Sequence, residues 1–188
     1  MNPRESFEAY AAGGFRVEGG GVYLSDENGA LYERYQEAVK QVGSVDELVP
    51  LLAIRFTGPR DLTYELWIPV LQRIRTLLGD DRDAALSEVM VHLIYGEDDD
   101  AEITWRELQN LYPTDLEILR VGLLVGFTWK DEEIVRTCLQ GLPPSPENLR
   151  IESCLDKTDW EGMRMLVHYD PHRLEWFQRA SQAFKARK

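Results

Sequence analysis

Polar helix-start residues, each followed by apolar residues at helical spacing, recur through the second half of the chain. They stand at intervals of about 12 to 17 residues, a spacing that suits helices of about three turns joined by short connections. The positions are Asp83, Asp100, Asp115, Asp131, Glu147, Asp159 and His172. This rhythm predicts short helices stacked as antiparallel pairs.

Helical periodicity also marks the residues that precede this series. One apolar stripe, at three- and four-residue spacing, predicts a helix from about Glu27 to Gly43; its members are Leu31, Tyr35, Ala38, Val39 and Val42. Ser44 and Glu47 form a capping box that starts a second helix, which Gly58-Pro59 closes. A longer helix is expected over Asp61–Leu78, with Pro69 either kinking it or dividing it into two pieces.

The N-terminal segment is glycine-rich and reads differently. Phe15–Glu18 and Val22–Leu24 flank Gly19–Gly21, a pattern that predicts a small β-hairpin. Such a hairpin is marginal alone in water, so it must pack on the helices or pair with another chain. No Gly-Lys-Ser/Thr follows the glycines, which argues against a phosphate loop. We therefore divide the chain into an extension, 1–26, and one helical domain, 27–188.

Two similar segments, 17 residues apart, indicate a repeated unit. Gly79–Leu86 and Gly96–Ile103 share one plan: a glycine ends a helix and acidic residues begin the next. Thr114 with Glu117 and Thr158 with Glu161 are two further capping boxes. Grouped in pairs, first helices begin near 101, 131 and 158, and their partners begin near 114, 146 and 171. The unit is about 27–30 residues, close to known two-helix repeats.

Trp105, Leu108 and Tyr112 stand at the spacing found in the first helix of a tetratricopeptide repeat. Over about residues 80–186 the chain resembles this tetratricopeptide-like class of α-helical repeats. The resemblance implies an all-α, right-handed α-solenoid of stacked helical hairpins with a concave, partner-binding surface. The chain departs from the pattern at Gln109, where glycine is usual, and at Pro113, which shortens the helix.

Composition narrows the class of protein. The 188 residues are 44% hydrophobic, enough for a core and too many for a disordered chain. No apolar run reaches the roughly 18–20 residues of a membrane span, and the N-terminus lacks the pattern of a secretory signal. Two cysteines, Cys138 and Cys154, make no disulfide framework. We expect a cytoplasmic protein without a membrane partner.

Charge points toward a protein partner. The net charge of −12 disfavours binding to a phosphate backbone. The tail Lys185–Lys188 is basic, which leaves a nucleic-acid-associated regulator as one alternative, although cations also complement the end of a last helix.

The sequence contains no residue pattern typical of a metal site or of a catalytic site. The acidic run Glu97–Asp100 lacks the alternation and central glycine of a calcium loop, so we interpret it as a solvated connector with helix-capping acids. His168 and His172 have zinc-site spacing, but Pro171 stands between them, and His92 lies in an apolar stretch. Neither cysteine has the setting of a nucleophile. We expect no catalytic residue, no metal and no cofactor.

Aromatic side chains are the candidate partner-binding residues, since exposed aromatics concentrate binding energy. They are Trp105, Tyr112, Trp129, Trp160 and Trp176, and each has wedging between helices as its alternative role. Trp129 lies in a connector and is the one most expected at the surface. The hypothesis is an adaptor or regulatory protein whose acidic surface binds a basic or aromatic-bearing segment, or a second copy of itself. An enzyme with a diffuse acidic or metal-dependent site is the other alternative.

Overall fold

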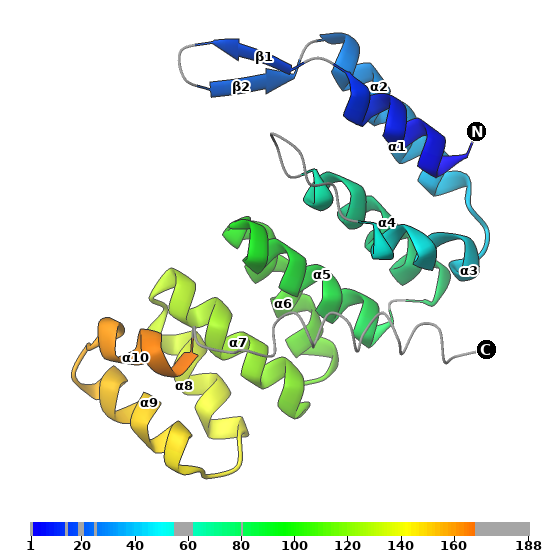
Figure 1. Ribbon diagram of the computed structural model, residues 1–188. Coiled ribbons are helices and arrows are strands. Elements are labelled where there is room, and N and C mark those ends of the chain that lie inside the picture. Colours follow the sequence, from blue (N-terminus) through cyan, green and yellow to red (C-terminus); the bar gives the residue numbers. More distant parts are fainter. Residues whose placement is uncertain are drawn as a thin grey trace. The chain divides into compact units, whose positions relative to one another are not determined.

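The computed structural model describes residues 2–13, 15–18, 21–24, 26–54, 62–79 and 81–167 (Figure 1). The fold is built from α-helices, with one small two-stranded sheet among the described residues. The chain divides into two compact units, with the boundary between Asp81 and Arg82. The boundary expected at residue 26 lies inside the first unit.

The first unit holds helices and the sheet in close succession along the chain. Its elements are α1 (Pro3–Ala12), β1 (Phe15–Glu18), β2 (Gly21–Leu24), α2 (Asp26–Gln41), α3 (Val45–Leu48), the 3-10 helix η1 (Val49–Ala53) and α4 (Thr63–Leu77). Strands β1 and β2 pair antiparallel, with Phe15 opposite Leu24 and Glu18 opposite Gly21. The turn expected at Gly19 and Gly20 lies outside the described residues.

Helix α1 is absent from the sequence analysis, which treats residues 1–26 as a glycine-rich extension. The Asn2 side chain caps it by accepting from the Arg4 N–H at 2.9 Å, and Pro3 occupies the first turn. Phe7 and Tyr10 are buried, and the Phe7 ring lies 4.9 Å from that of Tyr35 on α2. Two large apolar positions are too few to form a periodic stripe, so the helix leaves no signal by that criterion.

Pro69 lies inside α4, which continues through it as one helix and is not divided into two pieces. Proline has no N–H to donate to the Glu65 carbonyl one turn earlier. The Tyr32 hydroxyl of α2 donates to that carbonyl at 3.3 Å, and the Tyr35 hydroxyl donates to the carbonyl of Leu66. Burial raises the pKa of Tyr32 to about 12, which keeps the hydroxyl protonated as a donor.

The helix expected from Ser44 to Gly58 is shorter and changes type. Ser44 does cap it, because its hydroxyl accepts from the Asp46 N–H at 3.2 Å. One α-helical turn, α3, is followed by η1, in which Pro50 occupies the first turn. Since Pro50 lacks the N–H that would continue the α-helical ladder, the tighter helix takes over. Gly58 and Pro59 lie outside the described residues.

The second unit contains six described helices, whose starts follow the predicted series closely. They are α5 (Arg82–Tyr95), α6 (Asp98–Leu111), α7 (Leu116–Trp129), α8 (Glu132–Gly141), α9 (Pro146–Asp156) and α10 (Trp160–Val167). None of the described helices in either unit combines the length and apolar character needed to cross a membrane. The expected start at His172 and the last expected helix lie outside the described residues.

Two of the predicted capping residues are displaced by one position. Asp115, and not Thr114, caps α7 by accepting from the N–H groups of Glu117 and Ile118. Asp159 accepts from the Gly162 N–H at 2.8 Å, while Thr158 adopts a left-handed backbone at φ 55°. An aspartate beside a threonine competes for the same amides, and its charge also complements the helix dipole.

Helices in the second unit pack chiefly on their sequence neighbours. The most extensive contacts join α5 with α6 and α7 with α8; of the expected pairs, α6 with α7 is in substantial contact, α8 with α9 is in limited contact, and the partner expected for α10 lies outside the described residues. Helix α6 also packs on α7, and α10 packs back on α7. Packing of neighbour on neighbour is consistent with a helical-repeat class of protein.

Gly122 of α7 lies against side chains from both α6 and α8. A Cβ placed there would lie 2.5 Å from the Cys138 sulfur of α8 and closer still to the Trp105 ring of α6. The Trp105 indole N–H donates to the Ile118 carbonyl at 2.9 Å, which satisfies the polar atom of this fully buried side chain. The missing side chain therefore allows α6 and α8 to approach α7 closely on both sides.

Arg82 ties the start of α5 to the start of α7. Its guanidinium donates to both carboxylate oxygens of Asp115, each at 2.8 Å, and to Glu117 at 2.8 Å, and it also pairs with Asp83. The hydrogen bond from Arg82 holds the pKa of Asp115 below its ordinary value. One carboxylate thus caps α7 and fixes α5 beside it.

We expect Gly122→Ala to lower the free energy of unfolding of the second unit by about 1–3 kcal/mol, because Trp105 and Cys138 must both move. Chemical denaturation monitored by circular dichroism measures the loss. Gly29→Ala in α2 is the matched control: its Cβ meets nothing within 4 Å, and alanine there should be neutral or stabilising. Equal stability of Gly122→Ala and the wild type would contradict the packing described.

A pair of Asp115 variants separates capping from ion pairing. Near neutral pH we expect Asp115→Asn, which can still cap, to cost about 1 kcal/mol and Asp115→Ala to cost about 2 kcal/mol. Since the folded pKa is lowered, the ion-pair contribution is present above the ordinary pKa of 3.8 and is lost as pH falls through the folded pKa. The gap between wild type and Asp115→Asn should therefore close in acid, as denaturation at several pH values would show. A gap that stays constant would refute the ion-pair assignment.

Candidate functional site

The start of α6 and the end of α7 lie side by side. Trp129, the last residue of α7, donates its indole N–H to the carbonyl of Asp98 at 3.3 Å, where α6 begins. Trp129 is 43% exposed, so a substantial part of the residue meets solvent although its N–H is bonded. A large aromatic side chain is therefore held in place at the surface.

Acidic residues occupy the starts of two helices next to this tryptophan: α6, which Trp129 contacts, and α8, which follows it in the sequence. Asp98, Asp99 and Asp100 occupy the first turn of α6, and Glu132 and Glu133 occupy the first turn of α8. Acidic side chains are favourable at helix N-termini because they complement the positive end of the helix dipole. We call residues 97–100, Trp129 and residues 131–133 the acidic edge.

Asp131 links the start of α8 to the end of α7 and lies near the middle of α6. Its side chain caps α8 by accepting from the Ile134 N–H at 3.0 Å, and its own N–H donates to the Gly126 carbonyl at 2.8 Å. Arg106 of α6 lies 3.9 Å from the Asp131 carboxylate and pairs with Glu102 at 2.7 Å. The edge is thus built on rigid helix ends rather than on a long loop.

The edge keeps a surplus of exposed negative charge. Glu132 is paired with Arg136 at 2.8 Å. The other five carboxylates of the edge form no ion pair with another residue of the described ranges: Glu97, Asp98, Asp99, Asp100 and Glu133. An exposed indole on the same edge as unpaired carboxylates suits a cationic side chain, which can gain a cation–π contact and charge pairing.

The five predicted aromatic residues do not form one surface. Trp105 is 1% exposed, so it is a core residue and its assignment as a partner-binding residue is corrected. Tyr112 is half-exposed at the opposite end of the α6–α7 pair, about 20 Å away along a 14-residue helix. Trp160 begins α10 and is half-buried, and Trp176 lies outside the described residues. Trp129 alone among the described four joins an exposed ring to a group of carboxylates.

A hollow with a volume of about 330 Å³ lies between α8 and α9. The sequence pattern does not predict it. Its apolar lining comes from Leu139, Leu142, Pro144 and Leu149, the last of them 61% exposed. Arg136 stands at its rim but is occupied by Glu132 and Asp156. An exposed leucine gives no sequence signal, because the helical pattern does not say which apolar residue lacks a neighbour.

The histidines, cysteines and carboxylates of the described residues form no cluster of three that could hold a metal ion. His92 is buried on α5, with its Nε2 atom 3.8 Å from a Glu88 oxygen, and His168 and His172 lie outside the described residues. Burial raises the pKa of the Cys138 thiol to about 12, which makes it unreactive near neutral pH.

Comparison with known proteins gave no match to any family model, curated protein or solved structure. The functional assignment therefore rests on the geometry of the chain itself.

The two thiols should differ in reactivity, since Cys138 is buried and Cys154 is partly exposed. We expect one thiol per native chain to react with an aromatic disulfide reagent and both to react after unfolding. Cys154→Ser should abolish the native reaction, while Cys138→Ser should leave it intact. Rapid labelling of Cys138 in the folded protein would contradict its burial.

Proposed function

We propose that this chain is an adaptor or regulatory protein that binds a basic segment of another protein at its acidic edge. The observation that carries the proposal is Trp129, which is 43% exposed and bonded to the start of α6, where the carboxylates have no ion-pair partner in the described structure. Dipole compensation accounts for the acidic residues at the helix starts, but it does not account for an exposed indole among them. Binding of arginine or lysine uses both features.

We further propose that the helices from Arg82 onward form a tetratricopeptide-like, right-handed stack. Support comes from the succession of short helices packed on their neighbours and from the buried Trp105, which wedges between α6 and α7. In such stacks each pair of helices buries the face of the next, and side chains at the helix ends remain free for a partner. The proposed role is binding and requires no catalytic residue, cofactor or metal.

Charge sets the expected character of the interaction. Carboxylates at an exposed edge attract a cationic segment over a distance comparable to the Debye length, about 10 Å at 0.1 M salt. Association should therefore be rapid and should weaken as ionic strength rises. An uncharged segment should gain little from this edge, because the indole alone offers a small apolar area.

The test is an isothermal titration calorimetry experiment in which a synthetic twelve-residue peptide of alternating arginine, glycine and serine is added to the protein. We expect Trp129→Ala to weaken binding about three- to thirtyfold, the range of a cation–π contact. Trp129→Phe keeps an aromatic ring but loses the indole N–H, so its affinity for the peptide should lie between those of the wild type and Trp129→Ala. Tyr112→Ala is the matched control at the far end of the same helix pair and should bind as the wild type does.

The result is interpretable only if the variants fold, which circular dichroism checks. A peptide with glutamine in place of each arginine should not bind, and added salt should weaken the arginine peptide. Equal affinity of wild type and Trp129→Ala, or equal binding of the glutamine peptide, would rule out the acidic edge as the binding surface.

A further inference from the structure

Arg106 of α6 lies against the acidic edge. Its Nε–H donates to the Glu102 carboxylate at 2.7 Å, and its Nη2 atom lies 3.9 Å from the Oδ2 atom of Asp131. The Arg106 side chain is 51% exposed, so it meets solvent as well as these carboxylates. The edge therefore already holds one guanidinium between two carboxylates, one from α6 and one from the N-cap of α8.

The residues of α6 that make these contacts share one stripe of the helix. Asp98, Glu102 and Arg106 are spaced by four residues, so they stand one turn apart on the same face. The Trp129 indole is bonded to the Asp98 carbonyl at one end of this stripe, and Asp131 approaches Arg106 at the other. The two ends are about 12 Å apart along the helix axis, a distance comparable to the Debye length at 0.1 M salt. A cation that contacts Trp129 therefore experiences the charge of Arg106.

The two contacts of Arg106 differ in strength. Its bond to Glu102 is short and charge-assisted, whereas a separation of 3.9 Å from Asp131 is too long for a hydrogen bond. The oxygens of Asp131 also differ: Oδ1 accepts from the Ile134 N–H and caps α8, while Oδ2 faces Arg106. A second guanidinium can therefore approach Oδ2 more closely than Arg106 does and leave the helix cap intact.

Two other cations of the edge are placed differently. Arg136 is hydrogen-bonded to Glu132 at 2.8 Å and to Asp156 at 3.0 Å, so both of its contacts are short. Lys130 is exposed at the end of α7 and forms no ion pair with another described residue. Among these three cations, Arg106 is the one that holds an edge carboxylate by a long contact.

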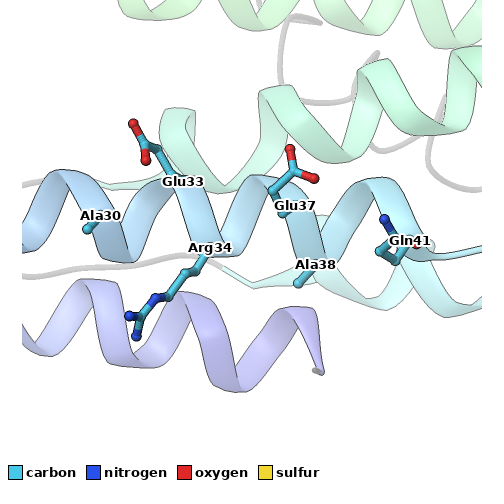
Figure 2. A pocket seen from close by; sticks show the side chains of 6 residues that line it. All are labelled: Ala30, Glu33, Arg34, Glu37, Ala38 and Gln41. Carbon is cyan, nitrogen blue, oxygen red and sulfur yellow. The ribbon is translucent and has the colours of Figure 1, made fainter.

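Arg34 of α2 shows that nearby glutamates do not always capture an arginine. Figure 2 shows Arg34 extending to one side of its helix and Glu33 and Glu37 extending to the other. Arg34 has alanines one turn away on either side, and it forms no ion pair with another described residue. The placement of Arg106 follows instead from Glu102 one turn before it, a spacing that favours pairing within a helix.

We propose that Arg106 is a built-in competitor at the acidic edge: a partner's arginine replaces it at Asp131, while Arg106 stays bound to Glu102. This inference rests on the proposed function, because it needs a cationic partner at the edge. The intramolecular guanidinium is always present, so a partner must offer more than one charge to replace it. Stacking on Trp129 supplies that additional contact, and a cation that does not reach the indole should bind poorly.

Calorimetric titration of Arg106→Gln with the arginine peptide tests this role. The variant leaves Glu102 and Asp131 to the peptide, so we expect the dissociation constant to fall about two- to fivefold, the range of one exposed ion pair. Lys130→Gln is the near control, because it removes a cation next to Asp131 that is not paired with it. Arg34→Gln is the control for net charge. Both controls should change the constant less than Arg106→Gln does.

Asp131→Asn, which can still cap α8, identifies the carboxylate concerned. We expect this change to weaken peptide binding more in the Arg106→Gln background than in the wild type, because Arg106 no longer neutralises the carboxylate there. In the Lys130→Gln background the loss should equal that in the wild type. Circular dichroism checks that each variant is folded.

The outcomes separate this inference from the proposed function. If the wild type binds through Trp129 but Arg106→Gln binds no more tightly than Lys130→Gln, the competitor role is overturned and the acidic edge stands. Weaker binding by Arg106→Gln, or an equal loss from Asp131→Asn in all three backgrounds, leads to the same conclusion. A wild type that does not bind the peptide even at low salt would overturn the proposed function and this inference together.

Discussion

The close approach of α6 and α8 to Gly122 of α7 is the constraint on which the second unit depends. Trp105 fills the space beside that glycine, and its indole donates to the Ile118 carbonyl at 2.9 Å. Because helices packed at this distance have little freedom to slide, their ends are fixed as well. The start of α6 therefore lies beside the end of α7, where Trp129 contacts the Asp98 carbonyl. One buried tryptophan sets the geometry in which another tryptophan is exposed.

Helix starts could be predicted from the sequence because capping is local. A side-chain oxygen reaches amides two or three residues ahead, so Asp115 and Asp131 announce α7 and α8 without knowledge of the tertiary structure. The partnership of helices is not local: α7 packs most extensively on α8, whereas the expected pair of α8 with α9 is in limited contact. Helix α1 was missed for the same reason: Phe7 and Tyr10 are stabilised by aromatic rings on α2, which no periodicity in α1 reveals.

The candidate site was predictable only in part. The acidic run after Gly96 is visible in the sequence, but its adjacency to Trp129 follows from the packing of α6 on α7. Trp129 itself ends α7 and does not lie in the connector that was expected there. The burial of Trp105 could not be predicted from its helical spacing, because a tryptophan packed between helices and one exposed to a partner can occupy the same position in the pattern. The ion pairs of the arginines could not be predicted from the sequence either. Arg82 is held by carboxylates far along the chain, whereas Arg34 has no such partner in the described structure.

The carboxylates of the acidic edge have two roles, one in helix stability and one in the proposed binding. They stabilise the starts of α6 and α8, and the surplus negative charge favours a cationic partner. The most direct test follows the indole N–H signals of the protein by NMR during titration with an arginine-rich peptide. The account predicts that the Trp129 signal shifts with peptide concentration while that of the buried Trp105 stays in place. An unmoved Trp129 signal, or a shift of Trp105 in its stead, would contradict it.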